Sequence, residues 1–210
     1  AAAVEAGADA LLLSLGDGSQ GVQALDALPE LVGSVPWGVS LDAPTGETVQ
    51  ALKEKGCDYL VFPLGRTPLS ILRDEEIGKV LMVDSSLEER LAHGIEQLAV
   101  DAALASVDAQ GPLTLDHLLE YLYLFSLTGL PLLITLPHQW ATGDLEELRD
   151  DGVSGLVVPF AGPEQVEEVR RLKEVIASLA PRSRRREGLQ PRLPYLSVHQ
   201  AEEEPDIDDE

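Results

Sequence analysis

The sequence predicts a parallel α/β fold of the (β/α)8, TIM-barrel type, and three observations support this. Apolar segments of a first kind recur four times, at residues 7–14, 56–63, 99–106 and 152–160. Segments of a second kind alternate with them, at residues 35–42, 78–84 and 130–137. Helical patterns follow these segments. Continuous apolar strands joined by helices are typical of a parallel sheet whose outer face is covered.

Each element follows from a local signal. Strands are expected at residues 8–15, 35–42, 58–64, 79–84, 100–106, 131–136 and 154–159. Helices are expected at 22–32 (broken near Pro29), 45–56, 67–73, 86–98, 114–129, 142–152 and 162–179, after a helix end at 1–6. Hydroxyl side chains mark the expected helix starts: Thr45, Thr67, Ser86, Thr114 and Thr142. Glycines mark helix ends at Gly7, Gly56, Gly129 and Gly152.

Two parallel folds fit this order of elements. An open doubly wound sheet normally carries a glycine-rich phosphate loop after its first strand, and Gly16-Asp17-Gly18 matches that loop poorly. A closed barrel needs eight strands, and its inner layers come from alternate strands, which suits the two alternating kinds of segment. The sequence therefore favours the barrel. We expect its first strand upstream of Ala1, because residues 1–6 resemble the end of a helix.

Composition limits the classes of partner. The 210 residues carry a formal charge of −22, of which the tail at 182–210 contributes −3, so the barrel domain at 1–181 carries −19. Such a surface repels nucleic acids and anionic membranes. The single Cys57 allows no intrachain disulfide, which fits a cytoplasmic protein. No apolar run reaches the roughly 18 residues of a spanning helix.

The tail differs from the rest of the chain. It begins with the basic run Arg182-Ser-Arg-Arg-Arg186 and ends in an acidic run, which is typical of a charged, flexible segment. One apolar stretch, Leu193-Pro-Tyr-Leu-Ser-Val198, interrupts it and resembles the second kind of strand. This stretch is expected to pack on the barrel or on a neighbouring subunit.

Candidate functional residues lie where the strands end, because barrels carry their sites at the C-terminal ends of the strands. Strand alternation predicts that Asp42 and Asp84 point inward, with Ser40 and Met82 on the same side. Two carboxylates can hold Mg²⁺ or Mn²⁺, which would polarise a carbonyl or stabilise an enolate. His138, after the sixth strand, is the candidate catalytic acid or base, together with Asp84.

Each of these residues also has a purely structural interpretation. Asp42 and Asp84 precede helix starts, where Asp commonly caps, and His138 and Arg66 lie in loops where exposure alone explains them. The four lysines lie on helices or at the N-terminal end of a strand. A Schiff-base aldolase mechanism, which needs a lysine in the barrel mouth, is therefore not expected.

Residues 131–159 resemble the closing βαβ unit of phosphate-binding (β/α)8 barrels. The resemblance rests on Leu130-Pro-Leu-Leu-Ile-Thr135, on Thr142-x-Asp-Leu-Glu-Glu-Leu148 and on Asp151-Gly-Val-Ser-Gly-Leu-Val-Val158. Those families, which include indole-glycerol-phosphate synthases, thiamine-phosphate synthases and FMN-linked barrels, place glycines after their last two strands. Here Pro137 and Pro159-Phe160 stand instead, and proline has no N–H to offer a phosphate. The resemblance therefore predicts a degenerate phosphate motif and no FMN or NAD.

Two functions remain open on the sequence. The first is a small-molecule site, used by a metal-assisted lyase or a related carbonyl enzyme. The second is a barrel without catalysis that serves as a binding or assembly module. A barrel that lacks one strand would also expose two sheet edges. An upstream segment is the simplest cover for the gap between those edges, and the tail is the alternative, within the chain or in a partner. For the tail we expect a homodimer in which it crosses the interface.

Overall fold

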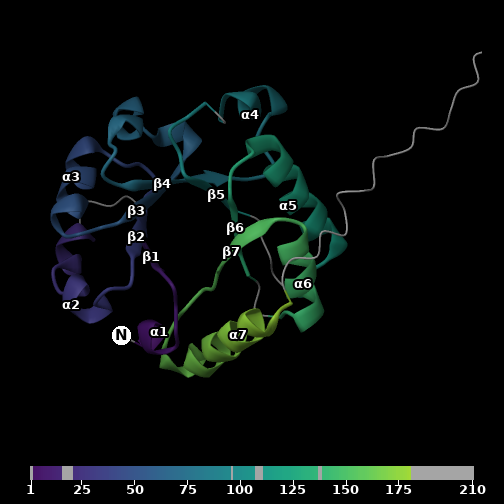
Figure 1. Ribbon diagram of the computed structural model, residues 1–210. Helices are drawn as coiled ribbons and strands as arrows, with labels where there is room; N and C mark the ends of the chain where they lie inside the picture. The colour runs from purple at the N-terminus through teal and green to yellow at the C-terminus, as the bar shows by residue number, and fades with distance from the viewer. Residues whose placement is uncertain (1, 16–20, 96, 107–110, 137–138, 181–210) are drawn as a thin grey trace, which may run out of the picture.

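The computed structural model describes residues 2–15, 21–95, 97–106, 111–136 and 139–180. It contains a single sheet of seven parallel strands, whose order in the sheet is their order in the chain. The strands are β1 (Leu11–Ser14), β2 (Trp37–Ser40), β3 (Tyr59–Pro63), β4 (Gly78–Val83), β5 (Ala102–Ala105), β6 (Leu132–Thr135) and β7 (Val153–Val157). The seven predicted strands are thereby confirmed. The sheet curls around an axis, with the helices outside it and β1 and β7 at its two edges (Figure 1).

Helices follow the strands as predicted, with small shifts in their bounds. They are α1 (Ala2–Glu5), α2 (Leu28–Val32), α3 (Gly46–Glu54), α4 (Glu89–Ile95), α5 (Leu115–Thr128), α6 (Thr142–Asp150) and α7 (Val166–Ser178). Short 3₁₀ helices occupy Val22–Leu25, Leu64–Arg66, Leu69–Arg73 and Pro163–Gln165. Thr45 and Thr114 cap α3 and α5 as expected, and each accepts a hydrogen bond from a backbone N–H three residues on. Gly129 ends α5 with a φ of 62°, a conformation that favours glycine.

Three expected caps are wrong. The Thr67 hydroxyl donates to the Pro63 carbonyl 2.6 Å away, and Pro68 is the residue before the helix. Ser86 bonds to Asp84, and α4 begins only at Glu89. The residue before α6 is Ala141 and not the expected cap Thr142, which is already the first residue of the helix. The Ala141 N–H donates to the Asp144 carboxylate at 2.7 Å. In each case a nearby carbonyl or carboxylate oxygen accepts a competing hydrogen bond, and a sequence pattern does not rank such competitors.

Helix α4 is only partly covered. Leu91 is 53% exposed, whereas Ala92 is buried. The break expected near Pro29 is present, because the turn at residues 26–27 separates the 3₁₀ helix Val22–Leu25 from α2. Pro29 is the second residue of α2, a position where its missing N–H has no helical partner to lose.

The two faces of the sheet carry two separate apolar clusters. Trp37, Val39 and Leu41 on β2 and just beyond it pack against the helices, as the strand alternation predicts. On the inner side of the curl, called the lumen below, a smaller cluster is centred on Val61, Val80 and Leu104. The lumen is therefore a packed apolar core, as in (β/α)8 barrels, and the polar groups that it displays lie at or beyond the C-terminal ends of the strands.

Aspartates at the starts of two strands bind the neighbouring strand. The Asp58 carboxylate accepts from the Trp37 N–H at 2.9 Å, and the Asp58 N–H donates to the Trp37 carbonyl at 2.9 Å. Asp101 makes the same pair of bonds with Lys79, both at 2.8 Å. We call Asp58 and Asp101 the strand-start aspartates. They join β2 to β3 and β4 to β5 at the N-terminal end of the barrel.

The expected boundary between a barrel domain and a tail at residue 181 stays a prediction, because residues 181–210 lie outside the described part of the chain. Within the described residues, no helix is long and apolar enough to cross a membrane.

Candidate functional site

The lumen is built from layers of side chains on alternate strands. One layer contains Leu12, Val61, Leu104 and Val157, from β1, β3, β5 and β7. Strand pairing places Leu12 level with Gly38 on β2, and Gly38 level with Tyr59 on β3. The layer's member on β3 is Val61, two residues beyond Tyr59. The layer is therefore displaced by two residues towards the C-terminal ends for every two strands. The same stagger relates Val61 to Leu104 and Leu104 to Val157. A (β/α)8 barrel with a shear of eight has this stagger.

The next layer towards the C-terminal ends comes from β2, β4 and β6, and it contains Ser40, Met82 and Thr135. Ser14 and Ser106 follow on β1 and just after β5, and both are exposed. The lumen therefore changes from apolar to largely hydroxyl-bearing within about one layer. Open hydroxyls at this end of a barrel are suited to hold a polar ligand.

Asp42 and Asp84 extend this hydroxyl-bearing end. Each lies two residues beyond a member of the Ser40–Met82 layer and just past the end of its strand, so the stagger, continued beyond the strand ends, would put both residues in one further layer, with only β3 between their strands. Two strand spacings and the two-residue stagger together correspond to roughly 12 Å between their Cα atoms. Both side chains are exposed. The two aspartates are thus accessible to a ligand above the lumen.

The structural role of Asp84 is also visible. Its Oδ1 accepts from the Ser86 N–H at 2.8 Å and from the Ser86 hydroxyl. This turn fixes the carboxylate at the end of β4 and does not engage its Oδ2. In the described ranges no group of three or more His, Cys, Asp or Glu side chains is close enough to hold a metal ion. A cation between Asp42 and Asp84 would therefore keep water or ligand oxygens as further ligands, which is common for Mg²⁺.

The other candidate residues are less well placed. His138 and Pro137 lie outside the described residues, so the expected catalytic role of His138 stays a prediction. Arg66 is exposed in the 3₁₀ helix after β3. Lys79 is buried at the start of β4, at the opposite end of the barrel from the candidate site.

Sequence reasoning missed Tyr59, which closes the lumen at its N-terminal end. Its hydroxyl donates to the Leu11 carbonyl at 2.8 Å. Its ring lies against Gly38 on β2, while Gly78 on β4 lies beside its Cβ. Burial raises the pKa of Tyr59 to about 12, and the nearby Cys57 and Asp58 add to the shift. An aromatic residue in register with glycines on both neighbouring strands was the signal available in the sequence.

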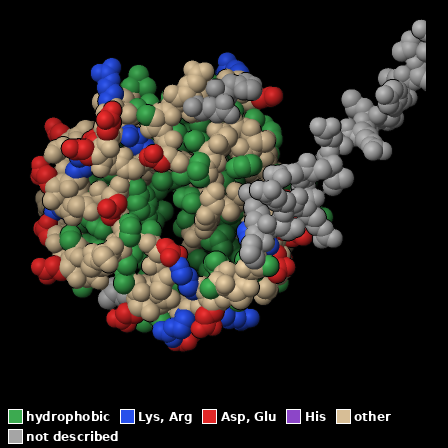
Figure 2. All heavy atoms as spheres, viewed as in Figure 1, with side chains coloured by type: hydrophobic (Ala, Val, Ile, Leu, Met, Phe, Trp, Pro, Cys, Tyr) green, Lys and Arg blue, Asp and Glu red, His purple; other side chains and the backbone are tan. Residues whose placement is uncertain are grey.

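A large cavity opens from the lumen through the gap between β1 and β7, which we call the seam. Its volume is about 910 Å³, and its walls are both edge strands, the inner side chains and one face of α7. Figure 2 shows a hollow in the middle of the molecule that is lined largely by hydrophobic side chains. The seam is thus wide, apolar and continuous with the core.

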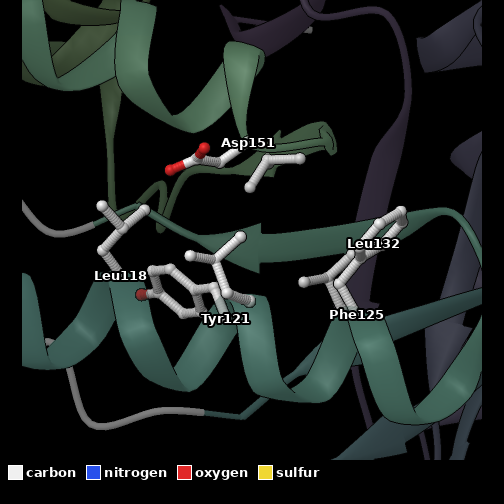
Figure 3. Close-up of a pocket in the computed structure, with 7 residues that line it drawn as sticks. Leu118, Tyr121, Phe125, Leu132 and Asp151 are labelled. Atoms are coloured by element: carbon white, nitrogen blue, oxygen red, sulfur yellow. The ribbon is translucent and has the colours of Figure 1, made fainter. Parts of the chain in front are cut away.

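A second, small pocket lies between α5, β6 and the start of β7. Figure 3 shows Tyr121 and Phe125 from α5 facing Leu132 and Asp151 across it. It has no room for a water molecule. The Tyr121 hydroxyl is buried there without a hydrogen-bond partner among the described residues. This pocket is a packing defect and not a ligand site.

Comparisons with known proteins agree with the fold. No protein-family model and no curated protein sequence matches the chain. Phosphoribosyl anthranilate isomerase from Thermus thermophilus is similar in structure, with a TM-score of 0.60 and 18% identity, over 85% of this chain and 92% of that one. An HpcH/HpaI aldolase from Desulfitobacterium hafniense DCB-2 gives a TM-score of 0.51 with 14% identity, over 85% and 87%. The YdjI aldolase from Escherichia coli K12 gives 0.53 with 12% identity, over 84% and 85%.

At these identities the likeness shows the fold alone. The seven parallel strands belong to a TIM-type α/β barrel, as the sequence predicted. The degenerate phosphate motif stays a prediction. Pro159 and Phe160 do follow β7, and Phe160 is partly buried at the wall of the large cavity.

Proposed function

We propose that the protein binds a small carbonyl compound, such as an oxoacid, at the C-terminal ends of its strands and acts on it as a metal-assisted lyase. Asp42 and Asp84 are the proposed ligands of a Mg²⁺ or Mn²⁺ ion. The observation that carries the proposal is the common layer of these two exposed carboxylates, directly above a layer that contains two hydroxyls.

Electrostatics explains why the ion and the compound belong together. The side chains that extend the lumen at this end are carboxylates and hydroxyls, and an anionic oxoacid would be repelled by them. A divalent cation between the carboxylates reverses the local charge and supplies the Lewis acid that polarises a carbonyl oxygen. Ser40 and Thr135, two layers below, are proposed to orient the compound through hydrogen bonds. His138, beyond β6, is the proposed acid or base.

A second function is favoured by a different observation. The seam leaves two strand edges and an apolar cavity open in the described part of the molecule, which suits a barrel that binds or assembles with another polypeptide. Proline and phenylalanine after β7 also replace the glycines of a phosphate cradle. For the same reason we propose that the protein uses neither FMN nor a nicotinamide cofactor.

Thermal unfolding with added ligands distinguishes the two functions. For the lyase, Mn²⁺ or Mg²⁺ raises the melting temperature, and oxalate or pyruvate adds a further rise only when the metal is present. A ligand at a hundredfold excess over its Kd stabilises by about 2.7 kcal/mol, which corresponds to roughly 5–10 °C for a domain of this size.

Isosteric variants test whether Asp42 and Asp84 cause the metal-dependent rise in melting temperature. Asp42→Asn and Asp84→Asn should abolish the metal-dependent rise, and Asp84→Asn retains the oxygen that accepts from Ser86. Glu47→Gln, on the exposed first turn of α3, removes the same charge elsewhere and should leave the rise intact. If the metals and oxoacids produce no shift in the unmodified protein, the lyase proposal fails and the binding-module function is favoured.

A further inference from the structure

The seam has the properties of a site for one more β-strand. The Leu11 N–H donates to the Pro36 carbonyl on the β2 side, so the backbone groups of Leu12 and Ser14 face the seam. On β7 the Val157 carbonyl accepts from the Leu136 N–H, so the backbone groups of Leu156 face the seam from the other side. Two parallel edges that face each other across an apolar cavity are suited to take up an extended segment.

The layers of the lumen indicate which kind of strand fits. On the even-numbered strands, Gly38, Val80 and Leu133 form a layer below Leu12 and Val61, by the stagger described above. A barrel layer has four members from alternate strands. The fourth member would come from a strand between β7 and β1. In the alternation of the chain this strand is of the second kind, like β2, β4 and β6.

Helix α7 is only half covered, which is consistent with a strand that belongs beside it. Its apolar face lines the cavity, yet only Leu172 is buried, at 5% exposed, while Ile176 is 40% exposed. In a (β/α)8 barrel each outer helix packs against the two strands next to it. A strand in the seam would supply the second contact for α7.

Asp9 supplies a specific anchor. It stands at the start of β1 where Asp58 and Asp101 stand at the starts of β3 and β5, after Gly7-Ala8 as Asp58 follows Gly56-Cys57. The carboxylates of Asp58 and Asp101 each accept a hydrogen bond from a backbone N–H on the preceding strand of the sheet. Asp9 has no such strand in the described residues. Its side chain is 87% exposed and bonds to Lys173 of α7.

We propose that residues 193–198 of the same chain bind in the seam as the eighth strand, parallel to β1 and β7. Leu193-Pro194-Tyr195 repeats the start of β2, Val35-Pro36-Trp37, and of β6, Leu130-Pro131-Leu132. In that register Tyr195 donates its N–H to Asp9, as Trp37 does to Asp58. Leu196 then completes the layer of Gly38, Val80 and Leu133.

The position where the described chain ends permits this topology. Ala180 lies at the wall of the seam, and its carbonyl accepts from the Arg149 guanidinium. Helix α7 runs back to the N-terminal ends of the strands, which is where a parallel strand must enter. Residues 181–192 provide the connection, and their five arginines, Arg182, Arg184, Arg185, Arg186 and Arg192, meet a barrel of net charge −19.

A stabilising variant in the full chain tests the proposal without the risk of misfolding. In the proposed register Ser197 takes the place of Val39 and Ile134, both of which are 0% exposed against the helices. Ser197→Val should therefore raise the melting temperature by roughly 2–6 °C, since it buries apolar surface against α7. Ser183→Val, in the same tail but outside the segment, should leave the melting temperature unchanged.

Amide exchange and mass measurement complete the test. Backbone amides at residues 12–14 and 156–158 should exchange slowly in the full chain, and Leu196→Asp should increase their exchange at least tenfold while the protein stays monomeric. Unchanged melting for Ser197→Val together with fast exchange at both edges would overturn the proposal. A dimer that dissociates on Leu196→Asp would also overturn it, because the segment would then occupy the seam of a second copy.

Discussion

Tyr59 occupies the space that a side chain on Gly38 would need. A Cβ built on Gly38 would lie 2.3 Å from Cδ2 of the Tyr59 ring and 2.5 Å from the Tyr59 carbonyl oxygen. The ring can turn away, but the backbone oxygen belongs to the β2–β3 ladder and cannot. The base of the lumen thus depends on one aromatic residue and the glycine beside it.

Gly38→Ala should destabilise the protein by roughly 1–3 kcal/mol, because it overpacks a rigid contact. The measurement is the free energy of unfolding in denaturant. Gly46→Ala is the matched control, since a Cβ on Gly46, at the start of α3, meets no atom within 4 Å. Equal stability of the two variants would contradict the predicted packing of Tyr59 on Gly38.

The ionisation of Tyr59 should be visible by ultraviolet titration. Burial raises its pKa to about 12 from the ordinary value of 10.0, so the folded protein favours the neutral phenol. Its contribution to stability is complete below pH 10 and is lost as the pH rises from about 10 to 12. Tyr59→Phe should remove this late step and, through the lost bond to Leu11, about 1 kcal/mol of stability. A Tyr59 that ionised near pH 10 would show that the lumen is solvated.

Tyr121→Phe should have the opposite effect. The hydroxyl of Tyr121 is buried without a partner in the described part of the structure, so its removal relieves a desolvation cost of about 1 kcal/mol or more. Denaturant unfolding of the two Tyr→Phe variants in parallel checks the pair. A loss of stability in both would mean that Tyr121 has a partner beyond the described residues.

Asp101→Ala should destabilise the barrel by roughly 1–3 kcal/mol, since the Lys79 N–H at the start of β4 loses its acceptor. Asp101→Asn keeps an acceptor oxygen and should recover most of the loss. Glu146→Ala, on the exposed face of α6, removes a carboxylate without any such bond and should be close to neutral. Thermal unfolding of the three variants distinguishes a specific bond from a general effect of charge.

The strands were predictable because their signal is local. Every buried strand in this chain except β5 is a run of apolar residues after a glycine or proline. The alternation of Trp37 and Val39 with Gly38 already separates the helix side from the lumen. Helix starts were less predictable. Thr67 and Ser86 have competing hydrogen-bond partners at Pro63 and Asp84, and three-dimensional proximity decides between them.

The sequence predicted the orientation of each candidate residue, but not how the candidate residues lie relative to one another. Strand alternation placed Asp42 and Asp84 on the inner side, but their common layer follows from the register of β2, β3 and β4, which no local pattern specifies. Tyr59 was missed because tyrosine in a strand is usual. Its role depends on glycines that lie 21 and 19 residues away in the sequence and next to it in the sheet.

The strand-start aspartates also bear on how reproducibly the strands align. The pairs that they join, β2 with β3 and β4 with β5, keep a continuous register. Between β6 and β7, where Ser154 stands in the corresponding position, the register slips by one residue between Leu132 and Leu133. A slip of one residue exchanges the inner and outer faces of a strand. The pairs β1–β2, β3–β4 and β5–β6 keep their register without such an aspartate. A carboxylate at the base of a strand is therefore one contribution among several to which side chains reach the mouth of the barrel, some 15 Å further along the chain by the rise of about 3.3 Å per residue.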